Sequence, residues 1–586
     1  MNIFKNLSVW DWVMIVIVAG LVVLQVWLDL TMPEYLNIVI TNATSPNPEM
    51  GLIWENGAYM LLCAIGSMVA AIFAGFFSAK VAAGFSKRMR SGVFDKVQSF
   101  STQEIHKFST ASLITRSTND ITQVQMTVAM GMQVLLKAPV LAIWCICKMV
   151  GESWQWTTAT AIVVGIILVT VIIALIVALP KFRRIQKQTD DVNDVTRESL
   201  RGIRVVRAYN AEKYQEEKFE KVNENLTKTN LFVNRVMQFM NPVMMLCMSG
   251  LTLAIYVIAC YLLNDATIMA RGEVLGNMME FSSYAMFVVM SFMLLIIVFI
   301  MLPRAITAGK RINEVLSTPQ TIFDGSISKS TSDKTGTIEF KNVSFAYPNA
   351  EEPVLKNINL KINKGETVAF IGSTGSGKST LINLIPRFYD VTDGQILIDD
   401  VDVRDYTLNA LHDKLGYVSQ KAVLFSGTVN SNIAYGEKSN FEHNQEQIQK
   451  AVQVAQSKDF VEKLPQQYDA VIEQGGANLS GGQKQRISIA RAIARQPEIY
   501  IFDDTFSALD YKTDAKLRAE LKKHTKDATN VIVAQRIGTI KNADKIVVLE
   551  NGEIVGMGKH EELLNSCDVY KEIALSQLSK EELENE

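Results

Sequence analysis

Residues 368–380 read VAFIGSTGSGKST, a short apolar strand followed at once by a glycine-rich loop. A helix-like run, residues 381–385, comes directly after the loop. Strand, loop and helix in this order match the P-loop pattern, in which glycines let backbone N–H groups approach phosphate oxygens and the helix N-terminus adds partial positive charge. We expect nucleotide phosphates to bind along the whole loop: Gly372, Ser373, Thr374, Gly375, Ser376, Gly377, Lys378, Ser379 and Thr380.

Two residue types in the loop have further roles in this pattern. The ammonium of Lys378 would reach the terminal phosphates, and the hydroxyl of Ser379 would bind Mg²⁺. A second apolar strand, residues 499–502, ends in Asp503 and Asp504. A carboxylate at the end of a strand beside the P-loop suits an Mg²⁺ ligand, and Asp503 fits that role. Asp504 would then stand where a water-activating base belongs.

Other motifs follow the P-loop in a fixed order. Gln420 comes after the strand-like residues 415–419, residues 478–486 read NLSGGQKQR, and residues 507–510 read SALD. The P-loop, Gln420, the LSGGQ sequence at 479–483 and SALD in this order resemble the nucleotide-binding domain of ABC transporters. LSGGQ ahead of a helix-like run would offer a hydroxyl and backbone donors at a helix N-terminus.

The resemblance implies roles for single residues. Tyr347 matches the aromatic residue that stacks on adenine, Gln420 the Q-loop residue counted among the Mg²⁺ ligands and catalytic groups, Asp510 the D-loop residue, and Gln535 the position of the switch histidine. In this family ATP lies between the P-loop of one domain and the LSGGQ of another. Four residues would therefore contact nucleotide held by a partner chain: Ser480, Gly481, Gly482 and Gln483.

The chain before about residue 305 has a different composition. It holds apolar runs of about 20 residues, long enough to span a bilayer, which mostly lack the polar face of a water-soluble helix. Six spans are predicted: residues 11–31, 57–78, 129–150, 157–179, 243–263 and 283–303. Five of the six cysteines fall in these runs, as small apolar fillers rather than metal ligands. The net charge of −2 gives no electrostatic reason to expect nucleic acid as a partner.

The Lys and Arg content of the loops indicates on which side of the membrane each loop lies. Residues 33–57, after the first span, contain no Lys or Arg, whereas the segments after the second and fourth spans are basic. Because cytoplasmic flanks accumulate positive charge, we expect both termini in the cytoplasm. The resemblance to ABC transporters implies that the nucleotide-binding domain lies there too, and that the chain resides in the inner (plasma) membrane of a bacterial cell.

Six spans fused ahead of such a domain resemble an ABC exporter half-transporter. The expected fold is an all-α transmembrane domain at 1–317, a linker at 318–335, an α/β P-loop nucleotide-binding domain at 336–575 and an acidic tail at 576–586. The loops at 79–128 and 180–240 are polar, helix-patterned and poor in Gly and Pro, so helices should continue from the spans well into the cytoplasm. Family analogy places transmission helices at 110–120 and near 207–213.

Asp504 and Gln535 stand where ATP cleavage would ask for glutamate and histidine. Aspartate is one methylene shorter, which withdraws its carboxylate by about 1 Å, and misplacement of that order can cost about 100-fold in rate. Gln535 can bond a γ-phosphate, but its amide does not titrate. The pattern resembles the degenerate-site subunit of heterodimeric bacterial multidrug ABC exporters, whose non-identical partner carries the catalytic Glu and His. The alternative is tolerated drift in an ordinary homodimer.

Substrate signals come from spans five and six. They are rich in methionine and phenylalanine, which adapt to irregular apolar shapes: Met240, Met244, Met245, Met248, Met286, Met290 and Met293, with Phe287 and Phe292. Lys137 is an intramembrane charge and a candidate cavity or gate residue. We expect export of hydrophobic, cationic compounds from the bilayer, at the expense of ATP and Mg²⁺. A lipid or glycolipid flippase, a homodimeric exporter, and an ATP-gated channel or regulatory subunit are the alternatives.

Overall fold

The computed structural model describes residues 7–150, 154–265, 267, 270–328, 335–348, 350–436 and 445–577. The chain forms two compact units, one made of Met1–Gln98 and Ala111–Thr318 and the other of Ser99–Thr110 and Pro319–Glu586. Each unit has its own buried apolar core. The predicted tail from residue 578 onward, and residues 329–334 of the predicted linker, lie outside the described residues.

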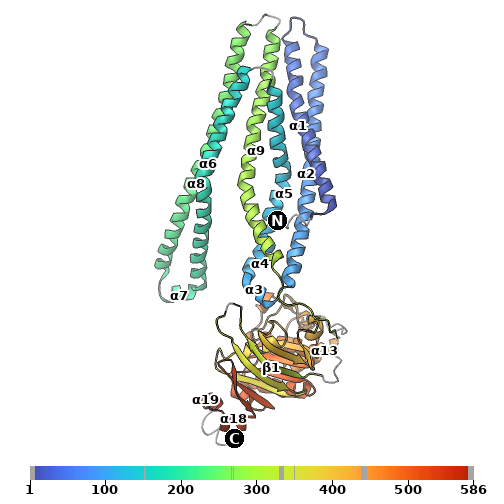
Figure 1. Ribbon diagram of the computed structural model, residues 1–586, viewed down its shortest axis with the longest axis vertical. Helices are drawn as coiled ribbons and strands as arrows, with labels where there is room; N and C mark the ends of the chain where they lie inside the picture. Colours follow the sequence, from blue (N-terminus) through green and yellow to red (C-terminus); the bar gives the residue numbers. More distant parts are fainter. Residues whose placement is uncertain are drawn as a thin grey trace. The chain divides into compact units, whose positions relative to one another are not determined.

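The first unit is helical (Figure 1). Six of its helices are long and apolar enough to cross a membrane, and they contain the six predicted spans except for Val150, the last residue of the third. Helix α1 packs on α2, α5 on α9 and α6 on α8. The helices are α1 Val9–Ala43, α2 Met50–Gln98, α4 Thr110–Ser117, α5 Asn119–Met149, α6 Trp154–Arg201, α7 Ile203–Ala208, α8 Glu212–Asp265 and α9 Arg271–Ser317.

These helices are longer than a bilayer requires. In a membrane the helix is favoured because it pairs every backbone N–H and C=O internally, and about 20 residues suffice for one crossing. Helices α2, α6 and α8 have 49, 48 and 54 residues. Helices α2, α6 and α8 therefore run on from the spans into the two long loops, as predicted, and the helices are interrupted at 99–101 and 209–211.

Helices α1 and α9 approach closely where α1 ends and α9 begins. A Cβ atom at Gly276 would overlap the side-chain oxygen of Asn37. The amide Nδ2 of Asn37 donates to Glu280 Oε2 at 2.6 Å, and Tyr284 donates to the carbonyl of Leu30 at 3.2 Å. Small residues at such crossings let backbones approach, and polar side chains then bond across the pair.

The second unit is an α/β domain built on two larger sheets. A four-stranded antiparallel sheet has the order β2-β1-β4-β5, and a six-stranded sheet has the order β12-β11-β3-β10-β9-β6. The strands are β1 Ile338–Phe345, β2 Leu355–Ile362, β3 Thr367–Gly372, β4 Asp393–Ile398, β5 Val401–Asp402, β6 Leu415–Val418, β7 Gly427–Thr428, β8 Val471–Ile472, β9 Ile499–Asp503, β10 Thr529–Val533, β11 Lys545–Glu550 and β12 Glu553–Gly558. The predicted strands at 368–371, 415–419 and 499–502 correspond to β3, β6 and β9.

Helices complete this unit. They are α3 Thr102–Phe108, α10 Lys378–Leu384, α11 Leu408–Asp413, α12 Val429–Ile433, α13 Gln445–Val454, α14 Lys458–Val461, α15 Gly481–Ala494, α16 Tyr511–His524, α17 Ile537–Ile540, α18 His560–Ser566 and α19 Asp568–Gln577, with 3₁₀ turns at Gln467–Asp469 and Gln474–Gly476. The expected transmission helix at 110–120 forms α4 and the start of α5, which belong to the first unit apart from Thr110. The loop segment that joins the second unit is Ser99–Thr110, with α3.

The topology gathers the motifs at one edge. Strands β3, β10, β9 and β6 are parallel neighbours, so their carboxyl ends lie along the same edge of the sheet, which is where open α/β sheets bind ligands. The P-loop leaves β3, Gln535 follows β10, Asp503 ends β9 and Gln420 follows β6. Residues far apart in the sequence thereby become neighbours.

Candidate functional site

The P-loop links β3 to α10 in a shape that requires glycine. Gly377 has φ 96°, in the left-handed region, and a Cβ there would lie 2.8 Å from Leu355 Cδ2. A Cβ on Gly372 would overlap the carbonyl oxygen of Leu549. A side chain at either position would collide with β2 or β11, so only glycine lets the loop take this shape.

Lys378 is the first residue of α10 and its ammonium turns back into the loop. Its Nζ donates to the carbonyls of Gly372 at 2.9 Å and Ser373 at 2.7 Å, and to Ser376 Oγ at 3.2 Å. Burial lowers the pKa of Lys378, and the nearby carboxylates Asp504 and Asp503 oppose that shift. The positive charge therefore sits within the loop, where nucleotide phosphates would supply anionic partners.

The two predicted Mg²⁺ ligands from α10 and β9 lie together. Ser379 Oγ donates to Asp503 Oδ1 at 2.9 Å. Burial raises the pKa of Asp503, helped by the charge of Asp504 and opposed by Ser379 and Lys378. A hydroxyl and a carboxylate are the hard oxygen ligands that Mg²⁺ prefers. The donor set fits ATP with Mg²⁺: the loop and Lys378 would hold phosphate, and Ser379 with Asp503 would hold the metal.

Asp504 is the centre of a second cluster. Its Oδ2 accepts N–H bonds from Gln535 at 2.8 Å and from Gln420 at 3.2 Å. The residue is 8% exposed and has φ 43°. The structure thus brings together the three predicted catalytic positions. Both amides bond the same oxygen of Asp504, and these two bonds fix the position of its carboxylate.

Gln577, at the end of α19, is a residue of this site that the sequence does not indicate. Its Nε2 donates to the carbonyl of Gln535 at 2.7 Å, and its Oε1 accepts from the N–H of Ile537 at 2.9 Å. One amide therefore closes the backbone turn that carries Gln535. No motif signals this residue, because the contact depends on how α19 packs.

Tyr347 lies beside the P-loop helix. Its hydroxyl is 3.1 Å from Thr380 Oγ1, and its ring meets those of Phe345 and Tyr389 edge-on at 5.0 and 5.4 Å between centroids. Packing by these two rings fixes the orientation of Tyr347. The aromatic residue expected to stack on adenine is thereby placed next to the loop expected to hold the phosphates.

LSGGQ and the D-loop form separate helix starts. Ser480 caps α15: its Oγ accepts from the N–H of Gln483 at 3.3 Å, and Gln483 Oε1 accepts from the N–H of Ser480 at 2.8 Å. Asp510 caps α16 through the N–H of Thr513 at 2.9 Å, and this bond lowers the pKa of Asp510. Among the described residues, no hydrogen bond joins Ser480–Gln483 to the P-loop. Ser480, Gly481 and Asp510 are exposed at these helix ends, where the partial positive charge of each helix N-terminus reaches the surface of the chain.

In the first unit, Lys137 has a partner. Its Nζ lies 3.3 Å from Asp29 Oδ2, and Ser67 donates to Asp29 Oδ1 at 2.5 Å. The ion pair and the hydrogen bond join α1, α2 and α5. Asp29 is thus the charged partner of Lys137, which the sequence alone does not indicate. Of the predicted methionines, Met240 and Met244 are buried within the unit, whereas others such as Met245 are exposed.

Two family models match the chain: the ABC transporter transmembrane region over residues 15–284, and ABC transporter over residues 355–507. The chain belongs to the ABC transporter family. It is an exporter subunit and a multi-pass membrane protein with a domain that binds ATP and couples its hydrolysis to transport.

Relatives of known sequence agree over most of the chain. An uncharacterized ABC transporter ATP-binding protein of Mycobacterium tuberculosis is 39% identical over 467 residues, covering 80% of this chain and 79% of that protein. The ABC transporter ATP-binding protein YfiB of Bacillus subtilis is 34% identical over 538 residues, 90% of each. The ATP-dependent lipid A-core flippase of Hahella chejuensis is 32% identical over 563 residues, 94% of this chain and 92% of the flippase.

A solved structure shows the same fold. The structure of a bacterial Atm1-family ABC exporter with ATP bound matches with a TM-score of 0.77 at 21% identity, covering 95% of this chain and 98% of that one. The predicted fold, six membrane helices followed by an ABC nucleotide-binding domain, is confirmed.

Proposed function

We propose that this ABC exporter chain is the degenerate-site subunit of a heterodimeric efflux pump. Its own P-loop would hold ATP and cleave it slowly, while its LSGGQ would complete the competent site of a non-identical partner. The observation that carries the proposal is Asp504, a shortened base whose Oδ2 is occupied by the amides of Gln535 and Gln420.

Each residue of this chain has a separable task. The loop N–H groups and Lys378 bind phosphate, and Ser379 and Asp503, with Gln420, hold Mg²⁺. When bound, Mg²⁺ would neutralise charge that develops on the phosphates during transfer. Asp504 is one methylene shorter than glutamate and is held in place by two amide bonds, so its carboxylate stays back from the position that would activate water. Binding chemistry is intact while the cleavage chemistry is impaired.

The substrate class follows from the first unit. Methionine-rich α8 and α9 give an adaptable apolar surface. We infer that the cargo is hydrophobic small molecules, carried outward from the cytoplasmic side of the membrane. The lysine and arginine content of the segments after spans two and four supports cytoplasmic termini in the plasma membrane.

Lipid flipping is the second candidate function. A relative that is 32% identical over 94% of this chain is named a lipid A-core flippase, and the same fold would serve either cargo. A fluorescent phospholipid that changes leaflet in proteoliposomes only with ATP would favour flipping. ATP-driven uptake of a lipophilic cationic dye into inverted vesicles would favour efflux of small molecules.

The heterodimer is tested by purifying the full chain in nanodiscs, with and without the ABC half-transporter encoded beside it. We expect nucleotide binding but slow ATP turnover from the chain alone, and fast turnover from the pair. Lys378→Ala, which removes the phosphate-binding ammonium, is the control for binding. Fast turnover by the chain alone, at the rate of the pair, would mean an ordinary homodimer.

A further inference from the structure

Residues 320–327, between α9 and β1, are hydrogen-bonded to the rest of the second unit. We call residues 320–327 the strap. Its backbone pairs with the chain just before α11: the N–H of Gly325 donates to the Tyr406 carbonyl at 2.9 Å, and the N–H of Ile327 donates to the Asp405 carbonyl at 2.9 Å. Ile327 and Tyr406 form a parallel bridge. The sequence suggests a linker here because strap residues are mostly polar and aperiodic, yet their backbone groups behave as an added strand.

The fit of the strap is close. A Cβ atom at position 325 would overlap the carbonyl of Asp405, so only glycine permits this approach. Next to it, Asp324 Oδ1 accepts from the N–H of Leu408 at 2.7 Å and so bonds the first turn of α11. Side chain and backbone therefore fix the strap at several consecutive positions.

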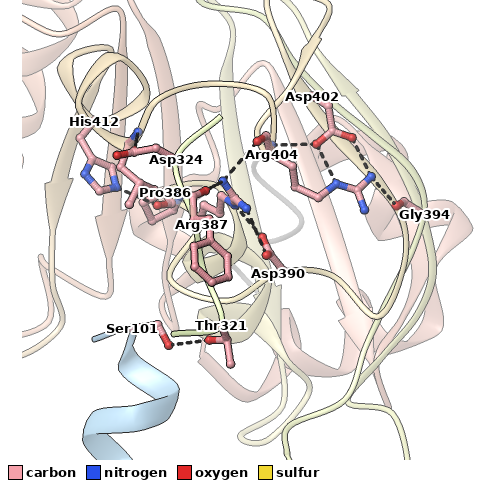
Figure 2. A network of polar contacts seen from close by, with 12 residues as sticks. Ser101, Thr321, Asp324, Pro386, Arg387, Asp390, Gly394, Asp402, Arg404 and His412 are labelled. Atoms are coloured by element: carbon pink, nitrogen blue, oxygen red, sulfur yellow. Dashed lines mark hydrogen bonds and ion pairs between the residues drawn. The ribbon is translucent and has the colours of Figure 1, made fainter. Parts of the chain in front are cut away.

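Arg387 fastens the strap to the P-loop helix. This residue follows α10, has φ 56° and is 7% exposed. Its Nη1 donates to the carbonyl of Phe323 at 2.9 Å and to that of Arg404 at 3.3 Å, while Nε and Nη2 bond Asp390 at 2.7 and 3.2 Å (Figure 2). A planar guanidinium can make these bonds together, whereas an ammonium cannot. Helix α10 thus has Lys378 at one end and the strap contact just beyond the other.

The opposite side of the strap holds α3. Thr321 Oγ1 donates to Glu104 Oε1 at 2.6 Å and lies 3.2 Å from Ser101 Oγ, as Figure 2 shows for the second pair, and Gln320 Nε2 donates to the Ser99 carbonyl at 3.2 Å. Glu104 is 3% exposed. Burial raises the pKa of Glu104, but the bonds from Ser101 and Thr321 outweigh it and lower the pKa overall. The carboxylate stays ionised and its hydrogen bonds are charge-assisted.

We propose that the strap is a mechanical link between the P-loop helix and α3, with Arg387 as the positioning residue. The chain runs from α2 into α3 and from α9 into the strap, so the membrane helices are covalently continuous with both linked parts. ATP binding at Lys378 would be transmitted through α10, Arg387 and Thr321 to α3. The proposal rests on ATP binding at this chain's P-loop, as in the proposed function.

Hydrogen exchange measured by mass spectrometry on the full chain in nanodiscs tests the link, with ATP and Mg²⁺ as the probe. In the unmodified chain we expect nucleotide to slow amide exchange both at 372–385 and at 99–108. Arg387→Lys keeps the positive charge beside Asp390 but loses the planar guanidinium that bonds Phe323 and Asp390 together. Thr321→Val replaces the hydroxyl that bonds Glu104 and Ser101 with a methyl group of similar size. In both variants we expect slowing at 372–385 to remain and slowing at 99–108 to be lost. Ser326→Ala is the matched control, because its hydroxyl makes no hydrogen bond among the described residues.

The outcomes separate the two proposals. If nucleotide slows exchange at neither segment of the unmodified chain, the nucleotide site itself fails. If it slows exchange at 372–385 but never at 99–108, or at 99–108 equally in Thr321→Val and the control, the link is wrong. A misfolded Arg387→Lys would be recognised by fast exchange throughout the second unit, and Thr321→Val then decides alone.

Discussion

Replacing Asp504 with glutamate, which is one methylene longer, should make a site that binds ATP and cleaves it slowly into one that cleaves ATP at a higher rate. In the present arrangement its Oδ2 accepts from Gln535 at 2.8 Å and from Gln420 at 3.2 Å. Asp504→Glu advances the carboxylate by about 1 Å, a displacement that is worth about 100-fold in rate when it places a catalytic group. That factor corresponds to about 2.7 kcal/mol in the activation barrier. Adding Gln535→His removes the shorter amide bond and should raise the rate further.

Single-turnover release of phosphate is the assay, on the pair of subunits in nanodiscs with the partner's own P-loop lysine replaced. Only the site formed by this chain's P-loop can then hydrolyse ATP. We expect Asp504→Glu to cleave ATP about 100-fold faster than the unmodified chain, at unchanged nucleotide affinity. Asp504→Asn is the size-matched control, and its amide cannot take a proton. If Asp504→Glu binds ATP normally and the rate stays at the level of Asp504→Asn, the shortened base is not what slows this site.

Three further predictions concern single contacts. Gln577→Ala frees the Gln535 carbonyl and should cost about 1 kcal/mol of local stability, seen as faster amide exchange in the turn after β10, whereas equal exchange would remove the role given to α19. Gly276→Ala overpacks the α1–α9 crossing and should lower the melting temperature through a loss of about 1–3 kcal/mol; Gly250→Ala, with no atom within 4 Å of its Cβ, is the control. Burial lowers the pKa of Lys378, so its ammonium loses the proton at a lower pH than an ordinary lysine does. The affinity for a fluorescent ATP analogue should therefore fall as the pH rises through the lowered pKa of Lys378. If the affinity of the unmodified chain is as independent of pH there as that of Lys378→Arg, the prediction is wrong.

Much of the site can be predicted from the sequence because its parts are local. The P-loop carries strand, glycines and helix within one short segment, so residues 372–380 can be placed from the residue pattern alone. Asp503 can be added because it follows an apolar strand, and parallel strands bring such positions to one edge. Gln535 can be added only through the resemblance to ABC transporters. The departures at Asp504 and Gln535 are visible as residue types.

The contacts of those residues cannot be predicted in this way, because they depend on tertiary packing. Nothing local indicates that Gln535 and Gln420 share one oxygen of Asp504, or that Gln577 closes the turn after β10. The strap has the composition of a linker, and its pairing with Asp405 and Tyr406 and its bond to Arg387 use backbone groups, which composition does not reveal. Family analogy places a transmission helix at 110–120, whereas the helix that belongs to the second unit, α3, lies just before it and is bonded through the side chain of Glu104.

The strap has a practical consequence for work on the soluble half alone. A fragment cut to begin at β1 would retain every nucleotide motif but lose Phe323 and the whole α3 segment. The guanidinium of Arg387 would then face water on one side, and the chain edge at Asp405 and Tyr406 would be left open. Rates and affinities measured on such an excised fragment would describe a P-loop helix that lacks its contacts with the strap and α3, whereas the membrane-bound protein retains both.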